Sequence, residues 1–350
     1  MLLSMQGIPL GTRASAADQR APLGGGARSS LAPTVGLVLL SWNRFDLLAA
    51  CLESVRRSDY RSIRIIVVDN GSTDGSPARL RERFPEVTVI ENGRNLGFAA
   101  ASNIGLRRLL DAGADLLLLL NDDTVISPTM IATLARALAS DATIGVVGPT
   151  IYYAAEPRTI WFAGGVIDRF GQAGHPRAGE QDQDGDAPPR DVDYISGCAL
   201  MVRRAALERV GLLDERFFAY YEETELCARV RASGYRIVIV PQAKMWHKVR
   251  PGDRPSSPVY LYLMARNRLL YLRCTGASAL TILVATLAIV RTAASWALRP
   301  RHRAMRRHAG TLLAAVRDFW LGRFGAPPAA VQQRQSCPTT PGGRPTSQPA

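Results

Sequence analysis

Two pairs of neighbouring carboxylates are the residues best suited to chemistry. The first follows a run of five leucines, where the chain reads Asn121-Asp122-Asp123. Adjacent carboxylates at the mouth of a buried strand are costly to desolvate, and a hard divalent cation bridged to phosphate oxygens is their natural partner. The alternative is a helix N-cap cluster. We favour the cation, because the apolar run buries this position too deeply for a casual charge pair.

The second pair opens a predicted helix. Glu222 and Glu223 are followed by Glu225 and preceded by four aromatic residues between positions 217 and 221. Acidic residues in a first helical turn stabilise the helix dipole, which explains at least one of the three. Aromatic surroundings can also raise the pKa of a carboxyl group toward that of a catalytic base. The pair is therefore a candidate general base.

Polar residues also end the first two predicted strands. Asn43 closes the first, and Asp69 closes the second in the sequence Asp69-Asn70-Gly71-Ser72. An aspartate at a strand end can accept from a nucleobase N–H or a ribose hydroxyl. The alternative is a turn in which Ser72 or Asp74 caps the next helix. Taken alone, the motif favours the turn.

Three further positions are suggestive. Asn95 and Gly97 lead into a helix, and small residues there allow the backbone to approach a diphosphate, whose charge a helix N-terminus favours. The sequence has no Gly-x-Gly-x-x-Gly pattern, so a dinucleotide fold is not indicated. His247 follows Trp246 and a predicted strand. A lone histidine is more often structural than a ligand, so both interpretations stay open.

The elements that must position these residues alternate regularly. Apolar runs predict strands at 35–42, 63–69, 87–92, 115–121 and 144–149. Helical spacing lies between them at 44–57, 75–84, 98–110 and 128–139. Such alternation predicts an α/β fold, with a parallel sheet covered on both faces. Ligands of such sheets bind beyond the carboxyl ends of the strands, where the polar motifs fall.

The second half of the chain is less regular. Residues 171–191 are rich in Gly, Asp and Pro and predict a mobile surface loop. A short helix, the acidic helix and a strand at 235–241 follow. A Tyr- and Arg-rich helix at 258–273 then leads into the uncharged run 275–290. Residues 1–33 and 326–350 lack periodicity, and we expect a disordered leader and a disordered tail.

The positive charge is concentrated near the C-terminal end. The formal net charge is +13. Between Tyr260 and Gly325 there are eleven arginines but a single acid, Asp318. A nucleic acid or an anionic bilayer could neutralise them. We favour the bilayer, because the neighbours are apolar and no nucleic-acid-binding module is recognisable. A helix over 275–290 reaches only about 24 Å, so we expect it to lie in the interface; a core helix is the alternative.

Cysteine usage indicates a reducing compartment. The five cysteines are widely separated and show no Cys-x-x-Cys spacing, which argues against a disulfide framework or a zinc cluster. The short apolar start meets Gly and Pro at once and does not form a convincing signal peptide. We therefore expect a cytoplasmic protein, peripheral to the inner face of the cell membrane.

The ordered set of motifs is more specific than any member. SWN, VVDNGSTDGS, NLGFAAASNIG, LLLLNDD, YISGCALMVRR, GLLDERFFAYYEETELCARV and a Trp-His pair follow one another over residues 35–325. This set resembles the inverting family-2 glycosyltransferases of GT-A fold, and especially their bacterial rhamnosyltransferase-like branch. The resemblance implies a mixed, mainly parallel sheet in a domain at 34–255, followed by a basic helical segment at 256–325.

The resemblance also implies roles for individual residues. Asp69 would contact the base of the nucleotide. Residues lining the nucleotide pocket would include Asn43, Asn95, Gly97 and Asp122. The stretch 121–123 takes the place of the family's Asp-x-Asp motif, so that Asp123 would be the main ligand of Mg²⁺ or Mn²⁺, with Asn121 and His247 as further ligands. Glu222-Glu223 takes the place of a Glu-Asp pair whose second member is the general base.

Two departures from that pattern leave alternatives open. Asn121 replaces the first Asp, and Glu223 is one methylene longer than the usual Asp, so Glu222 remains a candidate base. The implied activity is metal-assisted transfer from a nucleotide-sugar donor, with dTDP-rhamnose a possible one, to a glycan or lipid-linked hydroxyl in envelope polysaccharide synthesis. A catalytically silent sugar-nucleotide-binding scaffold is the alternative. A processive synthase is disfavoured, because Met245 stands where its Gln-x-x-Arg-Trp motif has Arg.

Overall fold

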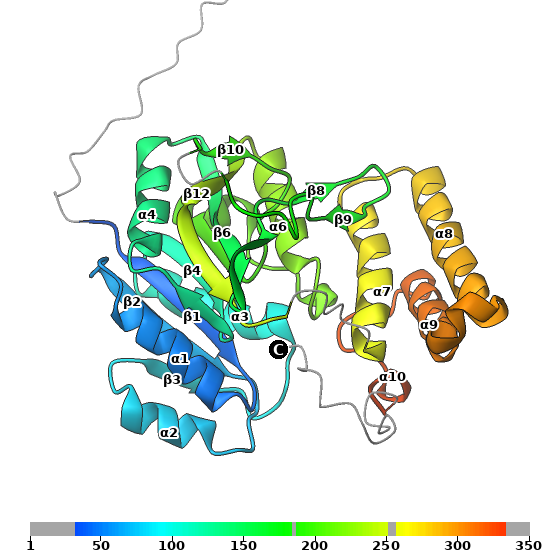
Figure 1. The fold of residues 1–350 in the computed structure, drawn as a ribbon, viewed down its shortest axis with the longest axis horizontal. Coiled ribbons are helices and arrows are strands. Elements are labelled where there is room, and N and C mark those ends of the chain that lie inside the picture. Colours follow the sequence, from blue (N-terminus) through cyan, green and yellow to red (C-terminus); the bar gives the residue numbers. More distant parts are fainter. Residues whose placement is uncertain (1–31, 184–186, 251–256, 334–350) are drawn as a thin grey trace, which may run out of the picture. The chain divides into compact units, whose positions relative to one another are not determined.

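The computed structural model describes residues 32–183, 187–250 and 257–333 (Figure 1). Most of the predicted leader and tail, residues 1–31 and 334–350, therefore lies outside the described residues. The predicted tail begins too early, however. Residues Ala329–Gln333 form helix α10, and Val331 within it is buried against other C-terminal helices.

A mixed sheet carries the fold. Its strands lie in the order β10-β12-β6-β11-β4-β1-β2-β3, with β5 paired to β12 and β7 to β6. Parallel pairing joins β1 to β2 and β4, β2 to β3, and β6 to β12. The strands are β1 Val35–Ser41, β2 Ile63–Asp69, β3 Thr88–Glu91, β4 Leu116–Asn121, β5 Thr124–Ile126, β6 Ile144–Tyr153, β7 Glu156–Phe162, β10 Arg190–Asp191, β11 Ala199–Arg203 and β12 Arg236–His247. The predicted mixed α/β architecture is confirmed.

One central strand escaped the sequence pattern. β11 runs antiparallel between β4 and β6, so that Leu200 lies opposite Leu119 and Met201 opposite Leu118 and Val147. The apolar runs predict no strand here, because five residues are too few to show a clear hydrophobic period. Its insertion gives the otherwise parallel centre of the sheet its mixed character.

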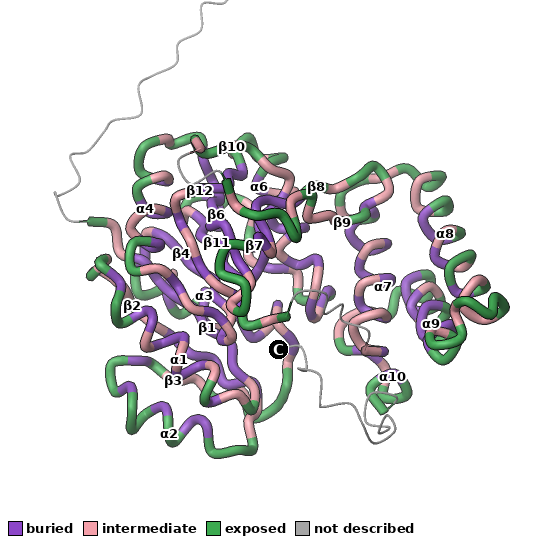
Figure 2. Tube along the Cα trace, in the orientation of Figure 1, coloured by how far each residue is buried: buried purple, intermediate pink, exposed green. Residues whose placement is uncertain are grey.

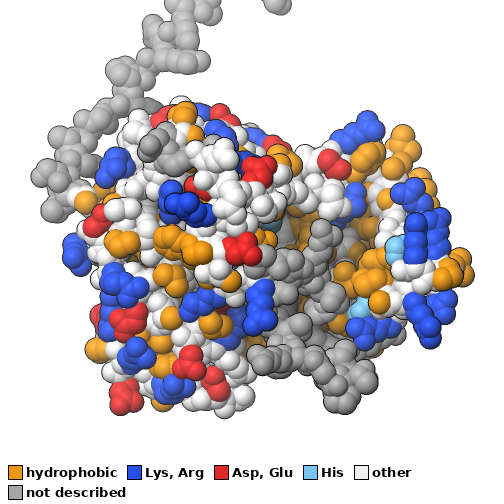
Figure 3. Space-filling model, viewed as in Figure 1, with side chains coloured by type: hydrophobic (Ala, Val, Ile, Leu, Met, Phe, Trp, Pro, Cys, Tyr) orange, Lys and Arg blue, Asp and Glu red, His pale blue; other side chains and the backbone are white. Residues whose placement is uncertain are grey.

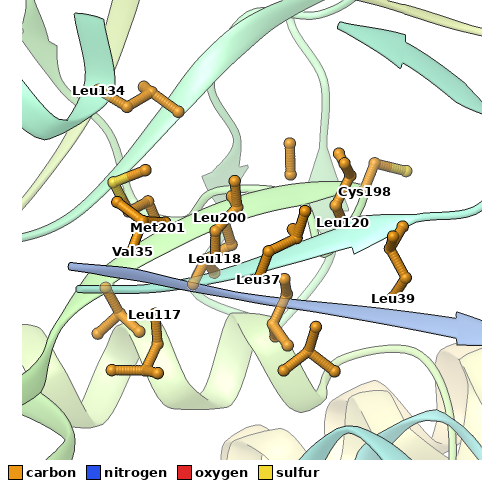
Figure 4. Close-up of a cluster of buried hydrophobic side chains, with 14 of the residues drawn as sticks. Val35, Leu37, Leu39, Leu117, Leu118, Leu120, Leu134, Cys198, Leu200 and Met201 are labelled. Atoms are coloured by element: carbon orange, nitrogen blue, oxygen red, sulfur yellow. The ribbon is translucent and has the colours of Figure 1, made fainter. Parts of the chain in front are cut away.

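Helices pack against the sheet much as the periodicity predicts. They are α1 Phe45–Arg56, α2 Ser76–Arg83, α3 Phe98–Asp111, α4 Met130–Ser140, α5 Arg204–Val210 and α6 Glu222–Ala232. A Cβ on Gly105 of α3 would come within 2.7 Å of Val38, so glycine allows this helix to approach β1 closely. Leu134 of α4 and Leu117 of β4 lie on opposite sides of the strands (Figure 4). Both faces of the sheet are therefore covered, and the central strands are buried (Figure 2).

The segment predicted as a loop at 171–191 contains short strands, so that prediction is wrong where the segment is described. β9 Ala173–Gly174 pairs with β8 Val166–Ile167, and β10 pairs with β12. The Asp168 carboxylate accepts from the backbone N–H groups of Phe170 and Gln172, which closes the β8–β9 turn. A local side-chain turn of this kind leaves no hydrophobic period to detect.

The C-terminal helices differ from the prediction mainly at one boundary. They are α7 Pro258–Cys274, α8 Ala279–Leu298, the 3₁₀ segment η2 Pro300–His308 and α9 Ala309–Trp320. Ser278 caps α8 by accepting from the N–H of Thr281, so the helix starts at Ala279, four residues after the start of the predicted run 275–290. It then continues past Arg291 to Leu298, for a total length of 20 residues, about 30 Å. The predicted length was too short, and α8 is the one described helix long and apolar enough to cross a membrane.

Candidate active site

Arg44 joins the two carboxylates that follow β4. Its Nη1 lies 3.4 Å from Oδ1 of Asp122 and 3.3 Å from Oδ2 of Asp123. Arg44 follows β1, and β1 pairs in parallel with β4, so the carboxyl ends of the two strands meet at one edge of the sheet. The sequence argument missed this arginine, although it directly follows the polar end of the first predicted strand.

His247, which comes much later in the sequence, also contacts Asp123 and joins Arg44, Asp122 and Asp123 in one cluster. It is the last residue of β12, and antiparallel pairing places it opposite Thr124, the residue after Asp123. Its Nε2 lies 3.0 Å from Oδ1 of Asp123, and its Nδ1 lies 3.9 Å from Sγ of Cys198. The ring also meets Trp161 edge-on, with centroids 4.7 Å apart. The register of β5 against β12 thus decides where this histidine goes.

Burial and charge set the proton affinities of the cluster. Burial, and then the neighbouring charge of Asp123, raise the pKa of Asp122 to about 7, against the opposing effect of Arg44. Burial also opposes ionisation of Asp123, but the hydrogen bond from His247 and the charges of His247 and Arg44 outweigh it and lower the pKa of Asp123. Burial alone would lower the pKa of His247, whereas Cys198 and Asp123 together raise it to about 10.

The donor set suits a hard cation. Oδ2 of Asp122 is buried and has no hydrogen-bond partner among the described residues, which leaves a carboxylate oxygen available. Within the described ranges, no three His, Cys, Asp or Glu side chains already surround a common point. A cation held by Asp123 and His247 would therefore take further ligands from diphosphate and water, as Mg²⁺ commonly does. The Asn121 amide nitrogen lies 3.4 Å from Sγ of Cys198.

Asp69 presents a second available carboxylate oxygen at the end of β2. It is 2% exposed, and its Oδ2 accepts from the backbone N–H groups of Gly71 and Ser72 at 3.1 and 2.9 Å. Its Oδ1 is buried and finds no hydrogen-bond donor in the part of the chain that the structure describes. The turn expected at this motif and the proposed nucleotide contact are thus compatible, because each uses a different oxygen.

Asn70 links the β2 end to the loop that contains Asn95 and Gly97. Its Nδ2 lies 3.0 Å from Oδ1 of Asn95, and its Oδ1 accepts from the N–H of Leu96. Asn95 in turn accepts from the N–H of Gly97. At Gly97, with φ +83°, a Cβ would come within 2.5 Å of the Phe218 ring. The side chain of Asn95 organises this loop, and Gly97 permits a close contact with the segment before α6.

Asn43 connects the loop after β1 to the loop after β2. Its N–H donates to Oγ of Ser72, and its Oδ1 accepts from the N–H of Thr73, both at 2.8 Å. Its backbone is left-handed, with φ +54°. Asn43 is exposed and holds the loops after β1 and β2 together, beside the carboxylate of Asp69.

Glu222 and Glu223 begin α6 in a buried, aromatic environment. One carboxylate oxygen of each, Oε2, is buried and has no hydrogen-bond partner within the described ranges. Burial is the main cause that raises the pKa of Glu222 well above its usual range, and the charge of Glu223 adds to it. Burial likewise raises the pKa of Glu223, although backbone amides, including that of Gly197, oppose the rise. A carboxyl group with a raised pKa is suited to general-base chemistry at neutral pH.

Glu225 has a different role. Its carboxylate oxygens lie 2.8 and 2.9 Å from Nε of Arg229, one helical turn further along α6. The same guanidinium donates to the carbonyl oxygens of Val210 and Leu212. Glu225 therefore anchors α6 through an ion pair with Arg229, which gives this acid a structural role.

Gly197 and Cys198 bring the two carboxylate pairs into one neighbourhood. A Cβ on Gly197 would lie 3.8 Å from Cβ of Glu223. The next residue, Cys198, contacts both Asn121 and His247 through its sulfur. The turn before β11 thus lies beside Glu223 of α6 on one side, and contacts Asn121 and His247 on the other. Glu223 and the contact between Asp123 and His247 therefore lie on either side of this one turn.

Comparison with known proteins gives both a family match and individual relatives. The family model described as glycosyl transferase family 2 matches residues 37–211. The N-acetylglucosaminyl-diphospho-decaprenol L-rhamnosyltransferase of Mycobacterium tuberculosis is 30% identical over 214 residues, covering 56% of this chain and 70% of that protein. The dTDP-rhamnosyl transferase RfbF of Shigella flexneri is 29% identical over 219 residues, covering 60% and 70%.

A solved structure shares the fold. The mannosyltransferase PcManGT of Pyrobaculum calidifontis, in complex with GDP-Man and Mn²⁺, superposes with a TM-score of 0.52 at 17% identity, covering 84% of this chain and 89% of that one. The sheet and the family match define the class of protein. The chain belongs to glycosyl transferase family 2. It is a glycosyltransferase of the GT-A type, as the motif resemblance predicted.

Proposed function

We propose that the protein moves rhamnose, with inversion, from dTDP-rhamnose to a hydroxyl of a lipid-linked glycan at the inner face of the cell membrane. Two relatives that are rhamnosyltransferases by name support the donor, and the decaprenol-linked substrate for which the mycobacterial one is named supports the acceptor class. The observation that carries the proposal is the opposition of two buried acidic groups across the Gly197-Cys198 turn.

Glu223 is the proposed general base. Its Oε2 is buried and has no donor among the described residues, so it can accept a proton from an incoming hydroxyl. Burial raises its pKa, which brings proton affinity closer to that of a neutral-pH base. Deprotonation lets the acceptor oxygen attack the anomeric carbon from the face opposite the departing diphosphate. One displacement inverts the anomeric configuration.

Asp69 is the proposed contact to the nucleotide base. Its Oδ1 is available to accept an N–H, while Oδ2 is held by the turn. Asn43 and Asn95 shape the loops on either side of it, and Gly97 keeps the second loop close to the segment before α6. These residues are proposed to orient the donor so that its anomeric carbon faces Glu223.

Asp123 and His247 are the proposed ligands of Mg²⁺ or Mn²⁺, with Asp122 beside the diphosphate and Asn121 as a supporting group. Support comes from the 3.0 Å contact between the two ligands and from the available Oδ2 of Asp122. A bound cation supplies charge neutralisation for the diphosphate as it leaves. Arg44, which contacts both carboxylates, is placed to neutralise the same charge.

The α8 helix is the proposed membrane contact. Apolar side chains on it are strongly exposed, with Leu280 69% and Leu287 57% accessible. Arginines of the following η2 segment lie close by in sequence and are exposed, and Figure 3 shows apolar and basic side chains gathered over the C-terminal helices. Apolar residues edged by arginines fit an anionic bilayer, where each basic residue adds about 1 kcal/mol to binding.

The decisive experiment is a transfer assay. The full-length protein is incubated with dTDP-rhamnose and a polyprenyl-diphosphate-linked N-acetylglucosamine acceptor, and the product is examined by mass spectrometry and NMR. We expect a rhamnosylated lipid whose anomeric configuration is opposite to that of the donor. UDP-, GDP- and other dTDP-sugars serve as controls. Tight donor binding with neither transfer nor donor hydrolysis would instead identify a silent scaffold.

A further inference from the structure

Two consecutive buried residues of α7 face the segment that leads into the acidic helix. Nδ2 of Asn267 lies 2.8 Å from each of three carbonyl oxygens, those of Phe217, Ala219 and Tyr220. Nη2 of Arg266 lies 3.3 Å from the Phe217 carbonyl oxygen as well. Both side chains are fully buried. One turn of α7 therefore binds most of the carbonyl groups of residues 217–220, immediately before Glu222.

The same segment has an unfavourable backbone. Phe218, Tyr220 and Tyr221 have φ values of +66°, +67° and +74°, in the left-handed region that non-glycine residues rarely adopt. Such conformations persist only where the surroundings determine them, and they gather at functional sites. Tyr221 is also the N-cap residue of α6, so its conformation sets the direction in which the first helical turn leaves the segment.

We propose that Asn267 is a positioning residue, which holds the 217–221 segment so that the Glu223 carboxylate points at the acceptor hydroxyl. This inference rests on the proposed role of Glu223 as the base. A side-chain amide nitrogen carries two hydrogens, which the three carbonyl oxygens share. An apolar residue of similar size would fill the same space but would leave those buried oxygens without donors, so the segment would relax.

The chemistry of the position makes Asn267 testable by near-isosteric replacement. Asn267→Asp preserves shape but replaces the donor with an acceptor that repels the three carbonyl oxygens. Asn267→Ala removes the donor, and Asn267→Ser retains a single one. If positioning is the role, activity falls in the order Asn, Ser, Ala, with Asp at least as damaging as Ala.

The kinetic experiment uses the full chain, dTDP-rhamnose and the lipid-linked acceptor. For Asn267→Ala we expect kcat to fall about 10- to 100-fold, because small misplacements of a reacting group cost up to about 100-fold. Donor KM should stay within about twofold, because the donor contacts at Asp69 and Asp123 are not made by α7.

Hydrogen exchange gives a readout that does not need activity. Amides of residues 218–225 should exchange faster in Asn267→Ala than in the natural protein, while those of β4 stay unchanged. The acid limb of the pH–kcat profile should also move to lower pH, because water admitted around Glu222 and Glu223 eases their ionisation. Other titratable groups that interact with the pair are Tyr194, Tyr220, Tyr221 and Cys227, and Tyr260 and Arg44 interact in turn with Tyr220.

Tyr262→Phe is the matched control. Tyr262 is buried in the same helix, and its hydroxyl donates to Oδ2 of Asp318 at 2.8 Å rather than to a carbonyl oxygen of residues 217–221. Loss of this hydroxyl should lower the melting temperature. The kcat and the hydrogen exchange of residues 218–225 should stay as in the natural protein. If Asn267→Ala behaves like Tyr262→Phe, the inference is overturned. Should the alanine variant not fold, the Ser and Asp variants decide between the same outcomes.

An inactive natural protein would refute the proposed function separately. In that case the exchange experiment still decides whether Asn267 holds the 217–221 segment. Unchanged exchange in both Asn267→Ala and Asn267→Ser would overturn that structural part, and faster exchange confined to 218–225 would support it.

Discussion

Nε2 of His247 lies 3.0 Å from Oδ1 of Asp123, although the two residues are far apart in the sequence. The contact exists because β5 and β12 pair in a register that sets His247 opposite Thr124. It brings a carboxylate and an imidazole together next to the available Oδ2 of Asp122. This pair is where dependence on a divalent cation can be tested most directly.

Asp123→Asn should abolish metal-dependent donor binding while leaving the fold intact. The substitution removes the charge that a divalent cation needs but keeps the shape of the side chain. Isothermal titration of the nucleotide sugar, with and without Mn²⁺, measures the effect. Asp46→Asn is the control, because Asp46 is a carboxylate of α1 with 93% side-chain exposure. This variant should bind the nucleotide sugar normally. Full activity in excess chelator would refute the cation site.

Glu223→Gln should lower kcat by about 10²–10⁴-fold with donor affinity nearly unchanged, because proton removal is required only in the transition state. Glu223→Asp should retain partial activity, and Glu222→Gln should be milder. Glu225→Gln is the control within the same helical turn, since its carboxylate is paired with Arg229 and its loss should affect stability more than kcat. Steady-state kinetics measure all four. A larger loss in Glu222→Gln would assign the base to Glu222.

The rate should fall as pH is lowered, with the acid limb lying above the ordinary glutamate range. Burial raises the pKa of Glu223, and the base must be deprotonated to act, so activity is lost as pH drops through that raised pKa. Replacing Glu223 should remove or displace this limb. A profile flat down to pH about 4.3, the ordinary glutamate pKa, would contradict the assignment.

Glu222→Gln should stabilise the protein at alkaline pH. Burial raises the pKa of Glu222 in the folded state, so its neutral form stabilises the fold below the unfolded-state pKa, and that contribution is lost as pH rises through the folded-state pKa. Glutamine imitates the neutral form at every pH. Melting temperatures of the two proteins should therefore diverge with increasing pH, in favour of Glu222→Gln. Equal melting temperatures at pH 5 and 9 would show that the carboxyl group is not desolvated.

Gly97→Ala should destabilise the protein by roughly 2–4 kcal/mol, combining a left-handed backbone with overpacking. A Cβ there would meet the Phe218 ring at 2.5 Å and the Phe218 carbonyl oxygen at 2.6 Å. Gly93→Ala is the matched control, because Gly93 also has a positive φ, +69°, but a Cβ on it meets nothing within 4 Å. It should cost only about 1–2 kcal/mol. Chemical denaturation measures both, and equal losses would mean that the contact with Phe218 is unimportant.

Leu280→Ser combined with Leu287→Ser should weaken binding to anionic liposomes. Both leucines are exposed on α8, so the substitutions remove apolar area without disturbing the core. Cosedimentation with phosphatidylglycerol vesicles measures binding, which high salt should also weaken. Leu313 is an exposed leucine of α9, so Leu313→Ser tests whether the loss of liposome binding is specific to α8. Binding that ignores lipid charge would argue against the anionic surface.

Local sequence was sufficient for most of the strands and helices in the first half of the chain, and for the edge of the sheet where the candidate residues lie. Apolar runs predicted β1, β2, β3 and β4 closely, and β1 and β4 are buried along nearly their whole length, a pattern that is recognisable without knowing the partner strands. Ordered motifs identified the family, which the comparisons confirmed. Asp122 and Asp123 were singled out because two carboxylates follow a buried apolar run, and Glu222 and Glu223 because aromatic residues precede them, whereas the nucleotide role of Asp69 came from the family resemblance.

Tertiary structure decided what depends on register and on contacts between distant segments. The sequence did not indicate that His247 would lie opposite Thr124 at the end of β12, or that Arg44 would join Asp122 to Asp123. Asn267 was hidden for the same reason: within a helix it reads as one polar residue, and only the approach of α7 to residues 217–220 gives its amide three carbonyl oxygens to bind. Hydrophobic periodicity reports which face of an element is buried, whereas the partner on that face is chosen by the packing of the whole chain.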